Sequence, residues 1–245
     1  MPFRVAILAL LTSLASPAAA QDMPTVLPNN YVLSDILNSQ RIDAAIGTRP
    51  ARAGAPARPT RKTANPPTTR AQTSYRPSPA VSARVRRQFI AAMGGKIGVA
   101  NARPLAAAIE RTDPVANWSQ LVAADGLRTG DMADALTSYW ILNWVMANSA
   151  DSNRAQALAV REQVRSILAA NPGHAALGEA QRQEMSETFI LNFLVQHAAY
   201  TDALKRGDRA IQRRLGDAAV ARFRDEMGVD LRRLRLGNTG FVPAG

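Results

Sequence analysis

The side chains that most often carry out chemistry in proteins are scarce in this chain of 245 residues. Cysteine is absent, so the chain can form no disulfide, thiolate nucleophile or cysteine metal site. There are two histidines, His174 and His197, and neither has a second histidine three or four residues away. No zinc-protease, nucleophile-elbow or phosphate-loop motif occurs. Because a metal ion needs ligands that converge, we expect no metal site and no cofactor.

Glu184 and Glu187 are the carboxylates that best fit an enzyme. Glycoside hydrolases need a glutamic acid with a raised pKa in an apolar cleft and a second carboxylate opposite it, so a cell-wall-active hydrolase is one alternative. However, two glutamates three residues apart on a helix usually form a solvated face, and no second convergent group is recognisable. We therefore favour a non-enzymatic protein without catalytic residues.

The most apolar part of the chain contains a single amide, Asn143, between Trp140 and Trp144. Its pattern, aromatic-Ile-Leu-Asn-aromatic, returns 49 residues later at residues 189–193. A decayed duplication and a coincidence in apolar sequence both explain this repeat. A buried amide without a hydrogen-bond partner costs about 1 to 3 kcal/mol, so Asn143 and Asn192 must each have one.

Two roles for these amides are open. In the role that we favour, they bond to each other, to backbone carbonyls or to trapped water, and so fix the register of two core helices. In the other role, they line a small apolar cavity for a ligand between the two helices. The candidate residues are the same in both: Trp140, Asn143, Trp144, Phe189, Asn192, Phe193 and His197.

Helical periodicity and capping residues place these side chains on α-helices. From residue 79 onward the chain is rich in alanine and has almost no strand-like alternation, so we expect an all-α class. The architecture is a single orthogonal or bundle-like domain of six or seven helices over residues 79–245. The expected helices cover about 79–94, 104–111, a segment starting at 114, 132–148, 153–170, 179–205 and 208–227.

The helix expected over 132–148 is apolar on every side, which is typical of a buried helix. Its unbroken apolar stretches are too short to cross a membrane, so we expect it at the centre of the bundle. After the last helix, residues 228–241 combine leucines with arginines and glycines. They predict a short turn of helix or an edge-like extension that packs on the bundle.

The chain before residue 79 divides into three parts. Residues 1–20 have one cation, an apolar run and an Ala-x-Ala end, which predicts an export signal that is removed. The alternative, a membrane anchor, needs about 20 apolar residues, and this run ends at Thr12. Residues 21–46 contain one short amphipathic helical pattern, and residues 47–78 predict a disordered, Pro- and Arg-rich linker. We therefore expect a periplasmic or secreted protein.

The net charge of +11 is unevenly spread. Residues 21–78 carry eight Lys or Arg and three Asp or Glu, whereas residues 79–245 carry 21 and 16. The linker is a spacer in the simplest interpretation, and a weak contact with anionic envelope polymers is the alternative. We expect no nucleic-acid partner, because an exported chain does not meet nucleic acid and the arginines have no aromatic ladder beside them.

Three motifs give the chain a resemblance to a known family: SARVRRQFIAAMG, TSYWILNWVMANSA and GVDLRRLRLGNTGF. In this order they resemble an uncharacterised family of exported bacterial proteins with a helical domain of unknown function, over roughly residues 75–241. The resemblance implies a common helical fold and export, and it transfers no catalytic residue.

We therefore expect an exported helical protein that acts as an interaction or structural module of the cell envelope, with an unknown protein or envelope component as its partner. A small-ligand binder and a cell-wall-active hydrolase are the two alternatives. No transmembrane span is expected once the signal is removed.

Overall fold

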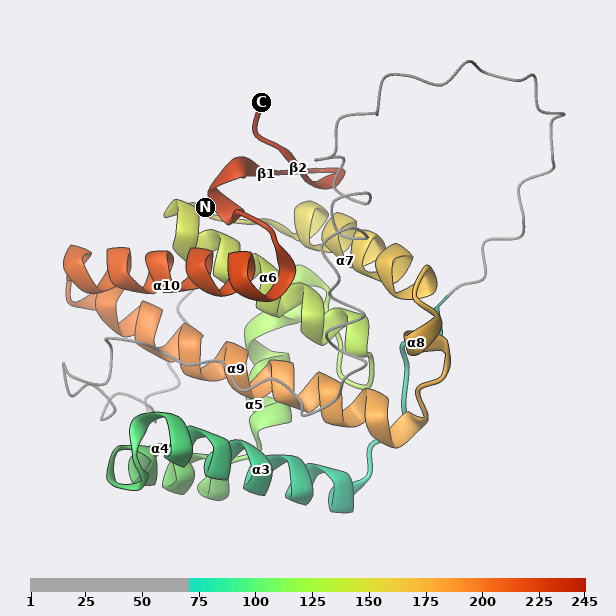
Figure 1. The fold of residues 1–245 in the computed structure, drawn as a ribbon, viewed down its shortest axis with the longest axis vertical. Helices are drawn as coiled ribbons and strands as arrows, with labels where there is room; N and C mark the ends of the chain where they lie inside the picture. The colour runs from blue at the N-terminus through green and yellow to red at the C-terminus, as the bar shows by residue number, and fades with distance from the viewer. Residues whose placement is uncertain (1–70) are drawn as a thin grey trace, which may run out of the picture.

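The computed structural model describes residues 71–245 (Figure 1). The export signal, the short helical pattern and most of the linker fall outside the described residues, so the structure does not test them. The described part is mostly helical, with one small two-stranded sheet, which confirms the predicted all-α class. Its α-helices are α3 (Pro79–Ile97), α4 (Val99–Arg111), α5 (Pro114–Val122), α6 (Met132–Asn148), α7 (Arg154–Ala169), α8 (Pro172–Ala175), α9 (Glu179–Lys205) and α10 (Arg209–Met227).

Residues 71–245 form eight α-helices instead of the expected six or seven. The additional helix is the single turn α8. The Asn171-Pro172 pair follows α7 and begins this short helix: the Asn171 side chain accepts a hydrogen bond from the backbone N–H of His174. Similar side-chain caps fix the starts of four other helices. The capping residues are Asp113, Asp131, Asn153 and Asp208.

Helix α6 lies at the centre, as its apolar sequence predicts. Every residue from Met132 to Ala147 is buried, because α7, α9 and α10 cover it from different sides (Figure 1). The crossing with α10 is close: a Cβ added at Gly216 would stand 2.5 Å from the backbone oxygen of Met146. Gly216 therefore allows two helix backbones to approach, which places α10 directly on the central helix.

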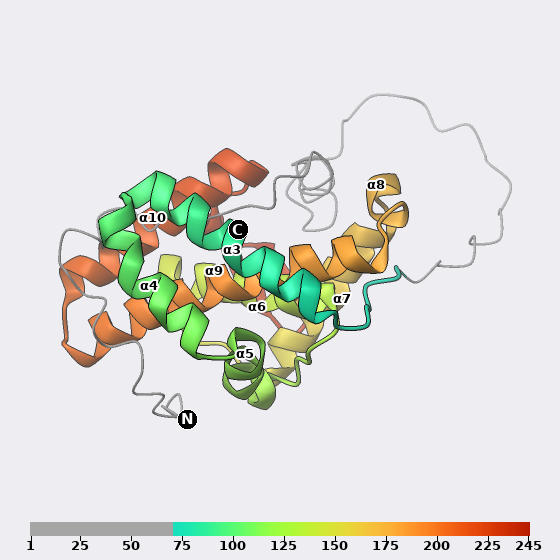
Figure 2. The same cartoon turned by 90° about the horizontal axis from the view of Figure 1, so that it is seen from below.

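Helices α3 and α4 form a separate layer on α9 (Figure 2). They share an apolar cluster of their own, in which Phe89 and Met93 of α3 meet Leu105 of α4 and Leu191 of α9. Gly98, with φ 85°, separates the two helices, so that α4 can turn back along α3. This hairpin is joined to the rest of the described fold mainly through α3 and α9.

Residues 71–78, which the sequence assigns to the linker, pack against the helices. The backbone of Tyr75 donates to the carbonyl of Gly130 at 2.9 Å, and its hydroxyl donates to Ser186 at 2.9 Å. The Arg182 guanidinium donates to the carbonyl of Ser74 at 2.9 Å. Residues 71–78 therefore belong to the folded domain, and they lie beside the starts of α6 and α9.

The C-terminal residues form both of the alternatives that the sequence leaves open. A 3₁₀ turn, Leu231–Arg233, leads into the antiparallel pair β1 (Leu234–Gly237) and β2 (Gly240–Pro243). Two glutamines of α7 bind this hairpin: Gln156 donates to the carbonyl of Leu236, and Gln163 bonds both the N–H and the carbonyl of Phe241. The two glutamine side chains therefore satisfy backbone N–H and C=O groups that would be unpaired at an exposed strand edge.

Candidate functional site

The amide of Asn143 connects three helices. Its side chain is fully buried on α6, and its Nδ2 donates to the carbonyl of Tyr139 at 2.7 Å and to Gln196 Oε1 of α9 at 3.0 Å. Its Oδ1 accepts a hydrogen bond of 2.6 Å from the Arg222 guanidinium of α10. Asn143, Gln196 and Arg222, hereafter the amide cluster, therefore tie α6, α9 and α10 together.

Asn192, the second predicted amide, is buried on α9 and donates to the carbonyl of Thr188 at 2.9 Å. The bond from α9 to Asn143 comes from Gln196, one turn further along the helix. Sequence reasoning missed Gln196, although the spacing Thr188, Asn192, Gln196 is a polar row at helical period. No signal in the sequence points to Arg222, because its contact depends on how α10 crosses α6.

Three of the aromatic candidates form contacts in three different places. Phe189 packs on Tyr139, with ring centroids 5.3 Å apart, inside the main core. Phe193 stacks on His197 at 5.4 Å and 12°, one turn apart on α9. Trp144 donates its indole N–H to the carbonyl of Leu234 at 2.9 Å and so holds the C-terminal hairpin.

Trp140 borders a small void rather than a ligand cavity. The void measures about 10 Å³, which is room for one water molecule at most. Its walls come from α6, α10 and the C-terminal segment, not from the space between α6 and α9. The lining residues are Trp140, Phe223, Met227, Val229, Leu231, Leu234 and Phe241.

Two titratable groups in the helical region have strongly shifted pKa values. Burial lowers the pKa of His197 to about 4, and the charge of Lys205 adds to this effect. Burial raises the pKa of Glu226 to about 7, against the opposing charges of Arg222 and Lys96. Glu226 Oε2 is buried without a hydrogen-bond partner in the described part of the chain. Near neutral pH, therefore, His197 is uncharged and Glu226 is partly protonated.

Glu184 and Glu187 both bind α3. Glu184 forms an ion pair of 2.9 Å with Arg84. Glu187 accepts hydrogen bonds from Ser82 at 2.7 Å and from Gln183 at 2.8 Å. Both carboxylates thus hold the α3–α4 layer on α9, and each acts on a different side chain of α3.

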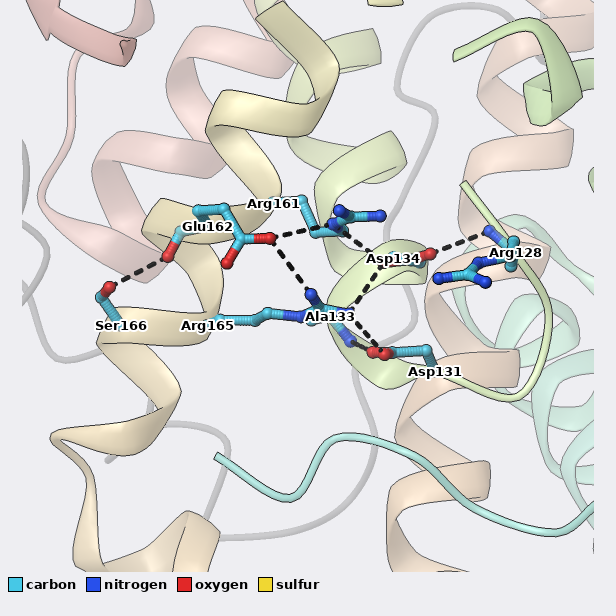
Figure 3. A network of polar contacts seen from close by, with 8 residues as sticks. All are labelled: Arg128, Asp131, Ala133, Asp134, Arg161, Glu162, Arg165 and Ser166. Carbon is cyan, nitrogen blue, oxygen red and sulfur yellow. Dashed lines mark hydrogen bonds and ion pairs between the residues drawn. The ribbon is translucent and has the colours of Figure 1, made fainter. Parts of the chain in front are cut away.

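A second polar network, which sequence reasoning missed, joins α7 to the start of α6 (Figure 3). Asp131 caps α6 and accepts a 2.8 Å bond from Arg165 of α7. Asp134 is buried, with one oxygen bonded to the backbone N–H of Arg128 at 2.9 Å and the other 3.8 Å from both Arg161 and Arg165. Burial, and then the charge of Asp131, raise the pKa of Asp134. The network is a helix-to-helix clamp.

The other histidine, His174, is buried in α8. Burial and the nearby charge of Arg182 lower its pKa, and its Nε2 has no hydrogen-bond partner among residues 71–245. Within the same residues, no three His, Asp or Glu side chains gather as a metal would require, and no helix has the length and apolar character to cross a membrane.

Comparison with known proteins gives one match. A family model described as "Family of unknown function (DUF6683)" matches residues 1–243, which is nearly the whole chain and extends beyond the region of the three motifs. No curated protein and no solved structure matches the chain.

Proposed function

The chain belongs to the DUF6683 family of unknown function, and we propose that it is an exported, non-enzymatic interaction module of the cell envelope. One observation carries this proposal. Most of the polar groups that could have formed an internal site, the amide of Asn143, the indole N–H of Trp144 and the two glutamates, bond instead to neighbouring helices or to the C-terminal hairpin.

The amide cluster, Trp144 and the two glutamates illustrate this. Asn143 joins three helices, Trp144 holds β1, and Glu187 receives two hydrogen bonds from neighbouring side chains. Groups that must hold a scaffold in register are poorly suited to bind and release a ligand. This supports a domain that acts through its outer surface.

No specific observation favours either alternative, the small-ligand binder or the cell-wall-active hydrolase. A ligand binder needs a pocket of several hundred Å³, and the void beside Trp140 measures about 10 Å³. A glycoside hydrolase needs two carboxylates on opposite sides of a cleft, and Glu184 and Glu187 instead contact Arg84 and Ser82 on α3.

Export is supported by the first 20 residues alone, with their single cation, apolar run and Ala-x-Ala end. Expression of the full chain with a C-terminal tag, followed by fractionation and N-terminal sequencing, tests this part. We expect a mature protein that begins near Gln21, outside the cytoplasm. An uncleaved chain in the cytoplasm would reject the envelope assignment.

The interaction role is tested by photo-crosslinking in living cells. A photoreactive residue is placed at exposed positions on different faces, such as Gln88 of α3, Gln120 of α5 and Asn238 of the β1–β2 turn. We expect one face to give a discrete adduct, while the other faces give none and serve as controls. The absence of adducts from every face would contradict an interaction module.

A further inference from the structure

Two large apolar side chains are exposed in the described residues: Val99 is 74% exposed and Leu204 is 49% exposed. Each lies at a corner where one helix turns into the next. Val99 begins α4 directly after α3, and Leu204 is the penultimate residue of α9, just before α10. Figures 1 and 2 both show these corners at the same end of the molecule, at the left of each view.

The same end carries most of the net positive charge of residues 71–245. Residues 96–103 and 202–214, hereafter the basic end, contain seven Lys or Arg and two Asp or Glu. The other residues of 71–245 contain 15 and 14, which nearly cancel. All seven basic side chains of this end are exposed: Lys96, Arg103, Lys205, Arg206, Arg209, Arg213 and Arg214.

The two acidic residues of the basic end are already engaged. Asp202 forms an ion pair with Arg206, and the Asp208 carboxylate caps α10 by accepting from two backbone N–H groups. Within the part of the chain that the structure describes, Arg206 is the one basic residue of this end with a carboxylate within 4.0 Å. The other six cations face solvent.

Exposed apolar tips surrounded by cations are the chemistry that an anionic bilayer surface recognises. The cations attract the headgroups, each strengthening binding by about fivefold near the surface, and the apolar tips enter the boundary between headgroups and acyl chains. A soluble polyanion would use the cations but has no apolar layer to receive Val99 and Leu204. The apolar tips therefore favour a lipid surface over a dissolved polymer.

We propose that the basic end is a contact surface for anionic lipid headgroups, with Val99 and Leu204 as its apolar anchors. This goes beyond the proposed function, which names no surface and no lipid. The contact is peripheral: the helices lie against the bilayer at two corners, and the remainder of the domain stays outside it.

The charge part of the proposal is tested with the full chain and vesicles of phosphatidylcholine, with and without phosphatidylglycerol. We expect sedimentation with the anionic vesicles, and weaker sedimentation at high salt. The triple variant Arg209→Gln, Arg213→Gln, Arg214→Gln should bind at least about tenfold more weakly. The matched triple Arg87→Gln, Arg233→Gln, Arg235→Gln removes three exposed cations elsewhere and should bind within about twofold of the parent.

The apolar part needs a second variant, Val99→Ser with Leu204→Ser. Both sites are exposed, so the fold should persist, and we expect a loss of vesicle binding of about tenfold or more, as befits two buried apolar anchors. Soluble polyglutamate serves as the polyanion probe, and the double variant should bind it like the parent. Equal vesicle binding by the two charge triples would overturn the proposal. A serine variant that binds vesicles as tightly as the parent would overturn it too.

Discussion

At Asn143, one buried side chain joins three helices through hydrogen bonds of 2.6 to 3.0 Å. An apolar residue of the same size would fill the space but would leave Gln196 and Arg222 without these bonds. The Arg222 bond involves a charged donor, which makes it stronger than a neutral one. Asn143 should therefore matter for stability more than its single amide suggests.

We expect Asn143→Leu to lower the free energy of unfolding by about 1 to 3 kcal/mol, because the hydrogen bonds from Asn143 to Gln196 and Arg222 are lost. Urea unfolding followed by circular dichroism measures this. Gln88→Leu, at an exposed amide of α3, is the control and should change stability by less than about 0.5 kcal/mol. A double-mutant cycle with Arg222→Met tests the 2.6 Å bond between Arg222 and Asn143. If the two losses of unfolding free energy were additive, this bond would contribute no coupling energy.

Glu226 and His197 make opposite contributions to the pH dependence of stability. The folded pKa of Glu226 is raised from 4.5 to about 7, so its contribution is complete below pH 4.5 and is lost as the pH rises through 7. The folded pKa of His197 is lowered from 6.5 to about 4, so its contribution is complete above pH 6.5 and is lost as the pH falls through 4. Between pH 4.5 and 6.5 the two slopes oppose each other.

Single variants should separate these slopes. Relative to the parent, Glu226→Gln should become more stable as the pH rises from 4.5 to 6.5, and His197→Gln should become less stable, each by at most about 1.4 kcal/mol per pH unit. Urea unfolding at three pH values across this range measures both slopes. The double variant is the control and should follow the parent. Two single variants with the same slope as the parent would contradict the assigned pKa values.

At the scale of elements, the α6–α10 crossing depends on a missing side chain. The Cβ of an alanine at Gly216 would stand 2.5 Å from the carbonyl oxygen of Met146, and backbone atoms cannot move aside as a flexible side chain can. Alanine favours helix by about 1 kcal/mol over glycine, so local propensity and packing oppose each other here. Steric overlap with a backbone should prevail.

We therefore expect Gly216→Ala to destabilise the protein by about 1 to 3 kcal/mol. Gly95→Ala is the matched control: Gly95 also lies in a helix, and its added Cβ would meet nothing within 4 Å. That change should stabilise by about 0.5 to 1 kcal/mol. Thermal and urea unfolding of both variants measure the difference, and two changes of the same sign would refute the close crossing.

The elements that sequence reasoning located well are those with local signals. Helix α6 was predicted with its observed bounds, and α9 likewise, because the helix-forming residues of each segment and the residues that end it are local in the sequence. Helix α4 begins five residues earlier than expected, since Gly98 rather than Pro104 marks the break. The hydrogen bonds between Gln163 and Phe241 join residues 78 positions apart, and no pattern within either segment predicts such a contact.

For the candidate site, too, the sequence predicts some features and not others. The burial of Asn143 and Asn192 follows from the apolar residues around them. The partner that Asn143 meets on α10 is set by a helix crossing that depends on Gly216, a residue 73 positions further along. Single-sequence patterns report which residues are inside, whereas the pairing of interior residues depends on tertiary packing.

At the scale of the molecule, the described residues have two apolar cores of unequal size. The larger core surrounds α6, and the smaller one lies between α3, α4 and α9. Leu191 is the one buried member of the smaller core that lies outside α3 and α4. The partly buried Val195 of α9 also packs against this core, and polar contacts join Arg84 to Glu184 and Ser82 to Glu187. Few apolar contacts across a boundary favour local opening, so the α3–α4 layer should detach before the main core unfolds.

Native-state hydrogen exchange on two leucine variants tests this order of opening. Leu191→Ala removes the apolar link, so it should lower the opening free energy of amides in both α4 and α6, by about 2 to 5 kcal/mol. Leu168→Ala, in the main core, should lower it for α6 by a similar amount and leave α4 unchanged, because the main core stays folded when the layer detaches. If Leu168→Ala lowered the opening free energy of α4 and of α6 equally, α3 and α4 would unfold only together with the whole domain. The corner at Val99 would then be as firmly held as the central helix, and its insertion into a bilayer would require the entire domain to approach as a rigid body.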